Sequence, residues 1–152
     1  MIELAERQHF DVVVLSAAWF TTDWTKLSTT LSALHKLGVP KVQVVGPLPY
    51  WEGGLPRQLL IEYSRTGTFP QRMHRGLSDE IASLDTPLRQ LVEAQGAEFL
   101  SPIGAMCSDA GCLTIEIPGE LKSLIAWDTG HLTSWGATEL VSLLYPRRAA
   151  NL

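Results

Sequence analysis

Three stretches of the chain have the hydrophobic pattern of strands, and the segment between the first two has the pattern of a helix. Residues 11–16 form a continuous run rich in valine, which is typical of a strand buried on both faces of a parallel sheet. Leucines at helical spacing over 21–37 predict a helix that Asp23 caps at its start. A second strand is expected over 41–45, so this part of the chain predicts a strand–helix–strand unit.

The middle of the chain predicts further helices and a third strand. Residues 55–65 and 77–95 have helical periodicity, and Pro87 is expected to kink or divide the second of these stretches. The short apolar run 97–100 predicts the third strand.

A last helix is expected to begin at Thr133 or Ser134 and to end near Tyr145. This order of elements predicts one α/β domain, a three-layer α/β/α sandwich around a parallel sheet. Sites in such folds lie at the carboxyl ends of the strands. Three segments follow the expected strands and should meet there: 16–19, 46–49 and 101–104.

Composition limits the classes of function. The 152 residues are 45% hydrophobic and 18% charged, which is ordinary for one folded, soluble domain. The net charge of -4 argues against nucleic acid as the main partner, because that binding needs concentrated positive charge. No apolar run is long enough for a transmembrane helix, and the first nine residues are too charged for a signal peptide.

Two cysteines, Cys107 and Cys112, enclose four residues that include a glycine. This spacing allows a small disulfide loop, and two free thiols in a reducing compartment fit the composition equally well. Two thiols are half of a tetrahedral metal site, and no histidine lies near them in the sequence. We therefore expect neither a metal nor a cofactor.

The most informative stretch for chemistry is 127–137, which contains Asp128 and His131. On a tight turn this spacing lets the carboxylate accept a hydrogen bond from imidazole Nδ1, which leaves Nε2 free to take a proton from a nucleophile. The alternative is structural, with Asp128 capping a turn and His131 serving only in packing.

This stretch resembles the last catalytic block of the SGNH (GDSL-type) hydrolases, and most closely the SGNH domains attached to acyltransferase-3 membrane proteins that O-acetylate surface polysaccharides. Its pattern is Asp-x-x-His-Leu-Thr-x-x-Gly-Ala before a C-terminal helix. Three other features fit: Trp19 after the first strand, the turn 46–49, and the cysteine pair before the block. The resemblance covers about residues 10–144.

The resemblance implies that His131 is a general base and that Asp128 orients it. It also implies a serine nucleophile in a Gly-Asp-Ser turn, which the 152 residues do not contain. Residues 1–152 are therefore expected to be one partial domain, its C-terminal two thirds, with the first strand and the nucleophile upstream of Met1. Such a chain alone should show no turnover, and the alternative is an inactive piece that binds a glycan or a partner.

Three residues after the first strand are candidates for the substrate pocket or the oxyanion region. Ser16 is the best nucleophile within the chain by position, but it lacks the preceding glycine of a nucleophile turn and could equally be a strand-end hydroxyl. Ala18 lies where the family usually has an oxyanion-binding asparagine. Trp19 is, by position, the best of several tryptophans for stacking on a sugar.

The resemblance also predicts partners and location. An acylated carbohydrate is the expected substrate, and the missing N-terminal segment or a membrane acyltransferase domain is the expected protein partner. The site should be periplasmic or otherwise extracytoplasmic, although the chain carries no export signal of its own. If the first strand is absent, the edge of the valine-rich strand 12–14 should be bare and could drive self-association.

Overall fold

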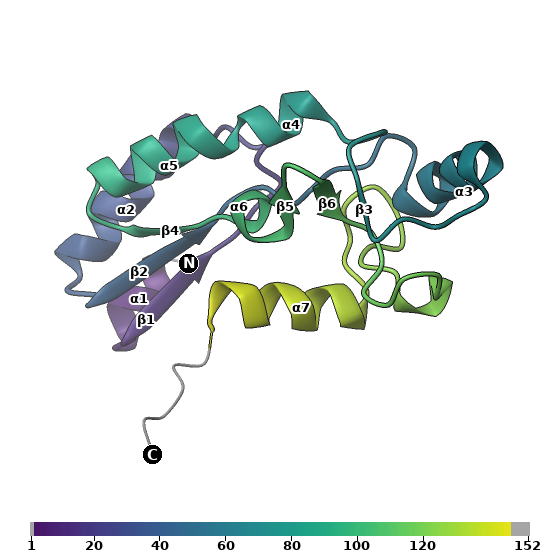
Figure 1. Ribbon diagram of the computed structural model, residues 1–152. Coiled ribbons are helices and arrows are strands. Elements are labelled where there is room, and N and C mark those ends of the chain that lie inside the picture. Colours follow the sequence, from purple (N-terminus) through teal and green to yellow (C-terminus); the bar gives the residue numbers. More distant parts are fainter. Residues whose placement is uncertain (1, 147–152) are drawn as a thin grey trace, which may run out of the picture. The chain divides into compact units, whose positions relative to one another are not determined.

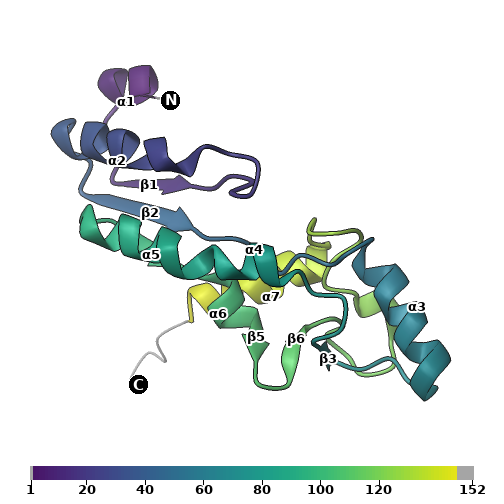
Figure 2. The same ribbon diagram turned by 90° about the horizontal axis from the view of Figure 1, so that it is seen from above.

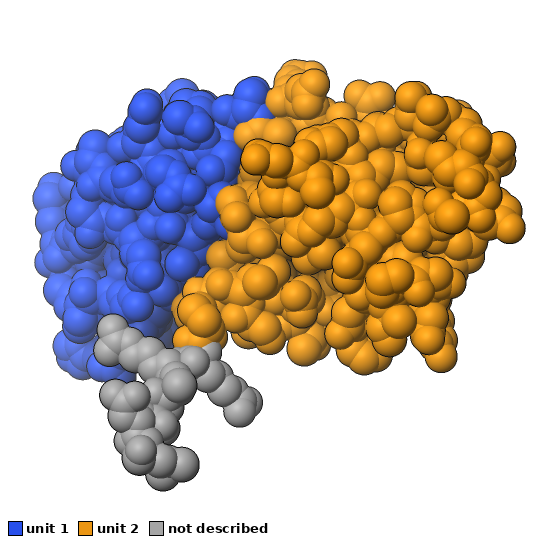
Figure 3. Space-filling view, in the orientation of Figure 1, with its two compact units in different colours: residues 1–47, 83–101 blue, residues 48–82, 102–152 orange. Residues whose placement is uncertain are grey.

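The computed structural model describes residues 2–146, and it contains seven α-helices and six strands within that range (Figures 1 and 2). The chain forms two compact units (Figure 3). Unit 1 comprises residues 1–47 and 83–101, and unit 2 comprises residues 48–82 and 102–152. Each unit has its own hydrophobic core.

Unit 1 is built on a three-stranded parallel sheet of order β1-β2-β4. The strands are β1 (Val12–Leu15), β2 (Lys41–Val45) and β4 (Glu98–Leu100). In register, Val13 lies opposite Val42 and Val44 lies opposite Phe99. The predicted parallel strand–helix–strand unit is therefore present, and the α/β fold class with a parallel sheet is confirmed.

Two helices of unit 1, α2 (Leu27–Lys36) and α5 (Asp85–Ala94), pack on the core face of this sheet (Figures 1 and 2). Leucines at helical spacing on α2 are fully buried there, as are Leu88 and Val92 of α5. A short helix, α1 (Ile2–Arg7), packs beside α2. The leucines that form the predicted apolar stripe of 21–37 therefore lie in the core of unit 1.

The start of that helix is later than predicted. A 3-10 turn, Trp24–Lys26, precedes α2, and the side chain of Asp23 makes no capping bond to it. Asp23 instead accepts a hydrogen bond from the Thr25 hydroxyl and pairs with Lys26. The expectation of a cap at Asp23 is wrong, because its carboxylate makes no capping hydrogen bond and interacts instead with Thr25 and Lys26.

The helical stretch 77–95 is divided into two helices, as predicted, and the break lies just before Pro87. The break lies at Leu84, between α4 (Asp79–Ser83) and α5. Pro87 is the third residue of α5, in the first turn, where a backbone N–H has no intrahelical partner. Its missing donor costs nothing at that position, so the helix continues through it.

The expectation that the valine-rich strand is buried on both faces is also wrong. Val12 and Val14 are 45% and 52% exposed, whereas Leu15 is buried in the core. The strand β1 lies at the edge of the sheet, and among the described residues it pairs with β2 alone. One face of the strand therefore stays open to solvent.

Unit 2 has the long helix α3 (Leu55–Thr66), the short helix α6 (Pro102–Met106) and the last helix α7 (Ser134–Leu144). A small antiparallel sheet of order β3-β6-β5, which the hydrophobic pattern did not predict, completes it. Its strands are β3 (Arg72–Met73), β6 (Gly111–Leu113) and β5 (Cys107–Ser108). The fully buried Trp51 lies in the core of this unit.

Cys107 and Cys112 are joined by a disulfide across the hairpin of β5 and β6, where they lie directly opposite each other. Of the two alternatives for these cysteines, the disulfide loop is therefore the one present, and free thiols are not. Gly111 completes the turn with a φ of +101°, and a β-carbon there would lie 2.4 Å from the carbonyl carbon of Met73. Only glycine fits between the hairpin and β3.

Candidate active site

The turn from Asp128 to His131 is held by the carboxylate of Asp128. One oxygen, Oδ1, accepts hydrogen bonds from the backbone N–H groups of Gly130 at 3.0 Å and His131 at 2.8 Å. The other, Oδ2, lies 2.7 Å from Nδ1 of His131. The carboxylate therefore shapes the turn and orients the imidazole at the same time.

The same backbone hydrogen bonds also favour the charged form of this carboxylate. The N–H of Gly130 lowers the pKa of Asp128 below its ordinary value, followed by the N–H of His131 and then its side chain. Asp128 is consequently an anion at neutral pH. An anionic acceptor favours the proton of the imidazole on Nδ1 and stabilises the ring when Nε2 gains a proton.

The imidazole is open to solvent, with 75% of the His131 side chain exposed. Among the described residues, no hydrogen bond to Nε2 is found. The indole of Trp127 stacks on the imidazole, with ring centroids 5.5 Å apart and an angle of 26° between the planes. The Nε2 atom can therefore meet an external group while the rest of the ring is held.

The segment before α3 anchors the turn from the opposite side. The N–H of Trp51 donates to the carbonyl of Thr129 at 2.7 Å, and the N–H of Leu55 donates to the carbonyl of Asp128 at 3.0 Å. Leu55 is the first residue of α3, so its N–H has no partner within the helix. The backbone N–H of Leu55, at the start of α3, thus holds the backbone of Asp128.

The helix α7 fixes the other end of the turn. Thr133 is its N-cap, and the threonine hydroxyl accepts a hydrogen bond from the N–H of Gly136 at 3.0 Å. The N–H of Thr133 in turn donates to the carbonyl of Ile125 at 2.9 Å. Of the two capping residues considered from the sequence, Thr133 is the one used. These contacts give the Thr-x-x-Gly part of the pattern a structural role.

No group of three or more metal-ligating side chains is found in the described residues 2–146. Within the same range, no helix is long and apolar enough to cross a membrane.

Comparison with known families identifies the fold. The sequence profile of the SGNH domain fused to AT3 domains matches residues 1–146. The chain belongs to this family. No curated protein sequence matches it.

A solved structure supports the same assignment. The SGNH chain superimposes on the periplasmic domain of the lipopolysaccharide acetyltransferase from Salmonella ser. Paratyphi A with a TM-score of 0.83 and 28% sequence identity. The match covers 93% of this chain and 57% of the Salmonella chain. The SGNH chain therefore spans little more than half the length of that relative.

The structure brings two of the predicted site residues of the SGNH domain together, Asp128 and His131, and their catalytic role stays a prediction. Ser16, Ala18 and Trp19 belong to unit 1, at the end of β1. Ser16 is exposed and lines a hollow of about 400 Å³ together with Trp19. The carbonyl of Ala18 accepts bonds from the N–H groups of the next turn.

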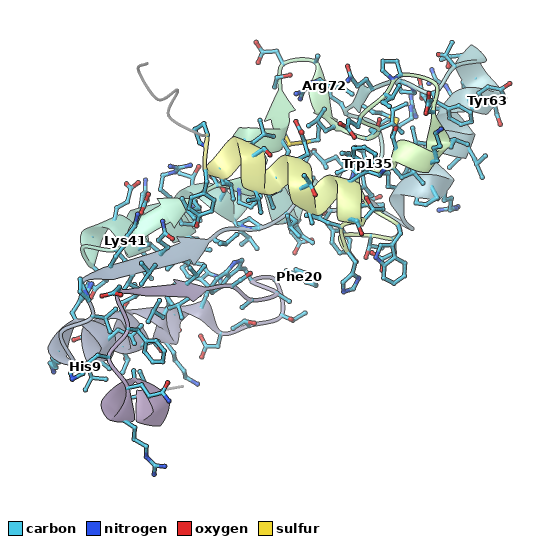
Figure 4. All side chains as sticks on the ribbon, turned by 90° about the horizontal axis from the view of Figure 1, so that it is seen from below. His9, Phe20, Lys41, Tyr63, Arg72 and Trp135 are labelled. Carbon is cyan, nitrogen blue, oxygen red and sulfur yellow. A yellow bond between two sulfur atoms is a disulfide. The ribbon has the colours of Figure 1, made fainter. Side chains whose placement is uncertain are left out.

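The expected role of Trp19 needs correction. Its ring is buried, and the indole Nε1–H donates to the carbonyl of Val45 at 2.8 Å. The indole N–H ties the ends of β1 and β2 together, and the ring, with only 5% exposed, offers a sugar little of its face. The exposed indoles are those of Trp127 and Trp135, at 61% and 48% exposure, and Figure 4 shows Trp135 at the start of α7.

Trp127 is a residue of the site whose contact with His131 was not predicted from the sequence. From the sequence, Trp127 is one of four tryptophans that could line a sugar-binding mouth, and packing is expected to bury most of them. The signal that would have singled it out is its position directly before Asp128, four residues from His131. In a turn whose flanking residues meet, that separation places the indole beside the imidazole.

Proposed function

We propose that this SGNH domain takes part in a serine-dependent O-acyltransferase or esterase that moves an acyl group, such as acetyl, on a surface carbohydrate. In this proposal, His131 is the general base and general acid, and Asp128 holds its ring. The observation that carries the proposal is the 2.7 Å contact between Asp128 Oδ2 and His131 Nδ1, on an imidazole that solvent can reach. The chain's family and the Salmonella lipopolysaccharide acetyltransferase domain support acyl transfer.

The chemistry would proceed in two halves. In the first, Nε2 of His131 takes the proton of a serine hydroxyl while the serine oxygen attacks the acyl carbonyl. The tetrahedral intermediate then collapses to an acyl-serine, and the departing group receives the proton. In the second half, a sugar hydroxyl attacks the acyl-serine and gives its proton to Nε2. The serine oxygen leaves and recovers that proton, and water in place of the sugar would give hydrolysis.

The serine of this scheme would come from a segment outside the 152 residues, because none of their serines lies in a Gly-Asp-Ser turn. The edge of β1, one of the two edge strands of the sheet, is a place in unit 1 where a further strand could pair. A membrane acyltransferase domain would supply the acyl group, and the reaction would take place outside the cytoplasm.

A carbohydrate acceptor is supported by the exposed aromatic rings that flank His131 in the sequence. Trp127 and Trp135 both expose their indoles to solvent, so their ring faces are available to a ligand. Indole faces offer flat apolar area for the C–H faces of sugar rings, and the indole N–H adds a hydrogen-bond donor.

The test first reads the DNA immediately upstream of Met1 for an in-frame Gly-Asp-Ser. The protein encoded by the whole reading frame is then assayed with p-nitrophenyl acetate and with an O-acetylated lipopolysaccharide. We expect His131→Ala to reduce turnover at least a hundredfold, because general base catalysis contributes about 10²–10⁴ in rate. Asp128→Asn should reduce it by a similar or larger factor, because the neutral amide favours the wrong tautomer.

The matched control is His35→Ala, which removes an exposed histidine from α2 and should leave turnover unchanged. Equal rates for the wild type and His131→Ala would refute the proposed role of His131. If both rates stay at background, the inactive, glycan-binding alternative is favoured. If the 152-residue chain alone is active and loses activity with His131→Ala, a serine within the chain is favoured as the nucleophile, and Ser16→Ala tests whether it is Ser16.

A further inference from the structure

Trp127 and His131 form a pair that closes the candidate catalytic turn from both ends. The backbone N–H of Trp127 donates to the carbonyl of His131 at 3.1 Å, beside an antiparallel bridge between Ala126 and Leu132. The two side chains then lie on the same side, where the indole stacks on the imidazole. The turn between them contains Asp128.

The hydrogen bond to Asp128 does not fix the imidazole alone. It restrains one ring atom, Nδ1, and a coupled rotation about the two side-chain torsions, χ1 and χ2, can still tilt the ring while Nδ1 stays near the carboxylate. Such a rotation swings Nε2 through space, because Nε2 lies on the far side of the ring. With 75% of the His131 side chain exposed, few other contacts oppose that motion. The indole lies against the ring face and blocks it.

We propose that Trp127 is a positioning residue that fixes the plane of the His131 ring and so the direction in which Nε2 points. The proposal rests on the proposed function only in that Nε2 is the atom that transfers the proton. A proton acceptor must lie within hydrogen-bond reach and in line with the hydroxyl, and a small displacement costs much of the rate.

The proposal distinguishes an aromatic side chain from an apolar one of similar bulk. The flat face of an indole or a phenyl ring can lie against the imidazole, and its negative π cloud attracts the ring when it carries a positive charge. A leucine covers the same region without a flat face or a π cloud. Trp127→Phe should therefore preserve the position of His131, whereas Trp127→Leu and Trp127→Ala should release it.

The experiment is NMR of the 152-residue chain with ¹⁵N-labelled histidine, at a pH where the imidazole is neutral. It measures the fraction of His131 with its proton on Nδ1 and the motion of the ring by relaxation. We expect a single Nδ1–H tautomer and an ordered ring in the wild type and in Trp127→Phe. In Trp127→Ala and Trp127→Leu, the ring should become mobile and the Nε2–H tautomer should appear. Trp135→Ala, which removes another exposed indole of unit 2, should behave as the wild type.

The amide signal of Gly130 shows whether the turn itself survives, because this N–H donates to Asp128. If Trp127→Ala loses that signal, the comparison of Trp127→Phe with Trp127→Leu decides. Equal ring motion and equal tautomer fractions in those two variants would overturn the proposal. It would also be overturned if the His131 ring of Trp127→Ala had the motion and tautomer of the wild type while the Gly130 signal was intact.

Turnover gives a second readout in the protein that carries the serine. With p-nitrophenyl acetate, which carries no sugar, Trp127→Leu should lower kcat about tenfold and leave KM unchanged, because ring orientation matters for proton transfer and not for binding of this donor. The two proposals can fail separately. If His131→Ala has no effect on turnover, the proposed function fails, while the NMR measurement still decides whether Trp127 holds the ring.

Discussion

A β-carbon on Gly136 would lie 2.0 Å from the carbonyl oxygen of Ile125, far inside the contact distance of the two atoms. The first turn of α7 therefore lies directly against the segment that leads into the turn of Asp128 and His131. Thr133 links the start of α7 to the segment at Ile125, since its N–H donates to the carbonyl of Ile125 and its hydroxyl accepts from the N–H of Gly136. The position of the candidate base thus depends on a glycine five residues after it.

Gly136→Ala should destabilise unit 2 by roughly 3 kcal/mol, because the atom that the new methyl group meets belongs to the backbone and cannot turn aside. Thermal or urea unfolding followed by circular dichroism measures the loss. Gly130→Ala is the matched control, since its β-carbon would meet the Tyr50 ring at an ordinary 3.6 Å. Equal stability of the two variants would contradict the close approach of α7.

Removal of the disulfide should cost unit 2 about 2 kcal/mol of unfolding free energy. Cys107 and Cys112 are five residues apart in the sequence, so the bond closes a small loop and restricts the unfolded chain only modestly. The variant with both cysteines changed to alanine should unfold at a lower urea concentration than the oxidised wild type. A reducing agent should shift the wild type by a similar amount and leave the double variant unchanged. An oxidised wild type that responds no more than the variant would contradict the prediction.

The sequence predicted those parts of the fold that depend on one long, regular pattern. The valine run of β1, the strand β2 and the leucines of α2 each repeat a signal over several residues, so the parallel unit they form was predictable. The small sheet of unit 2 was not, because its strands have only two or three residues, too few for any periodicity. Its register depends on tertiary contacts such as the fit of Gly111 against Met73.

In the site too, local contacts could be predicted from the sequence, whereas contacts between distant residues could not. The sequence pattern placed Asp128 three residues before His131, and a turn of that length brings the carboxylate to Nδ1. Burial of individual rings could not be predicted in this way. Trp19 is buried because its N–H finds the carbonyl of Val45, a contact between residues 26 apart in the chain. Trp127 stays exposed because its partner, His131, is itself at the surface.

Stability should depend on pH through Asp128 in a defined direction. Hydrogen bonds from Gly130 and His131 lower its pKa in the folded state below the ordinary value of 3.8, which the unfolded chain retains. The unfolded state therefore binds more protons between the two values, so stability falls as the pH falls. The contribution is fully present above pH 3.8 and is lost as the pH drops through the lowered pKa.

The measurement is urea unfolding of the wild type and Asp128→Asn across this acid range. The wild type should be the more stable at neutral pH, and the difference should shrink below pH 3.8. Direct titration of the Asp128 carboxyl carbon by NMR is the independent check. A midpoint at or above 3.8 would show that the backbone bonds do not favour the anion.

The open edge of β1 should make the 152-residue chain self-associate. Val12 and Val14 are half exposed on a strand that, in the described part of the chain, pairs on one side only. Such an edge presents unpaired backbone groups beside apolar side chains, and a charged residue there opposes pairing with another strand. Val14→Lys should therefore shift the chain toward monomer in sedimentation velocity. Val141→Lys, at a valine of similar exposure (57%) on helix α7, should associate like the wild type.

The same variant separates self-association from the pairing that the proposed function requires. In a protein that supplies a further strand at this edge, β1 would be covered. Val14→Lys should then leave the oligomeric state unchanged and lower the unfolding free energy instead, because the lysine would lie beside a paired strand. A wild-type chain of 152 residues that is monomeric at all concentrations would contradict the prediction of association. Identical behaviour of Val14→Lys and Val141→Lys would show that the association of the chain depends on general surface charge and not on the strand edge.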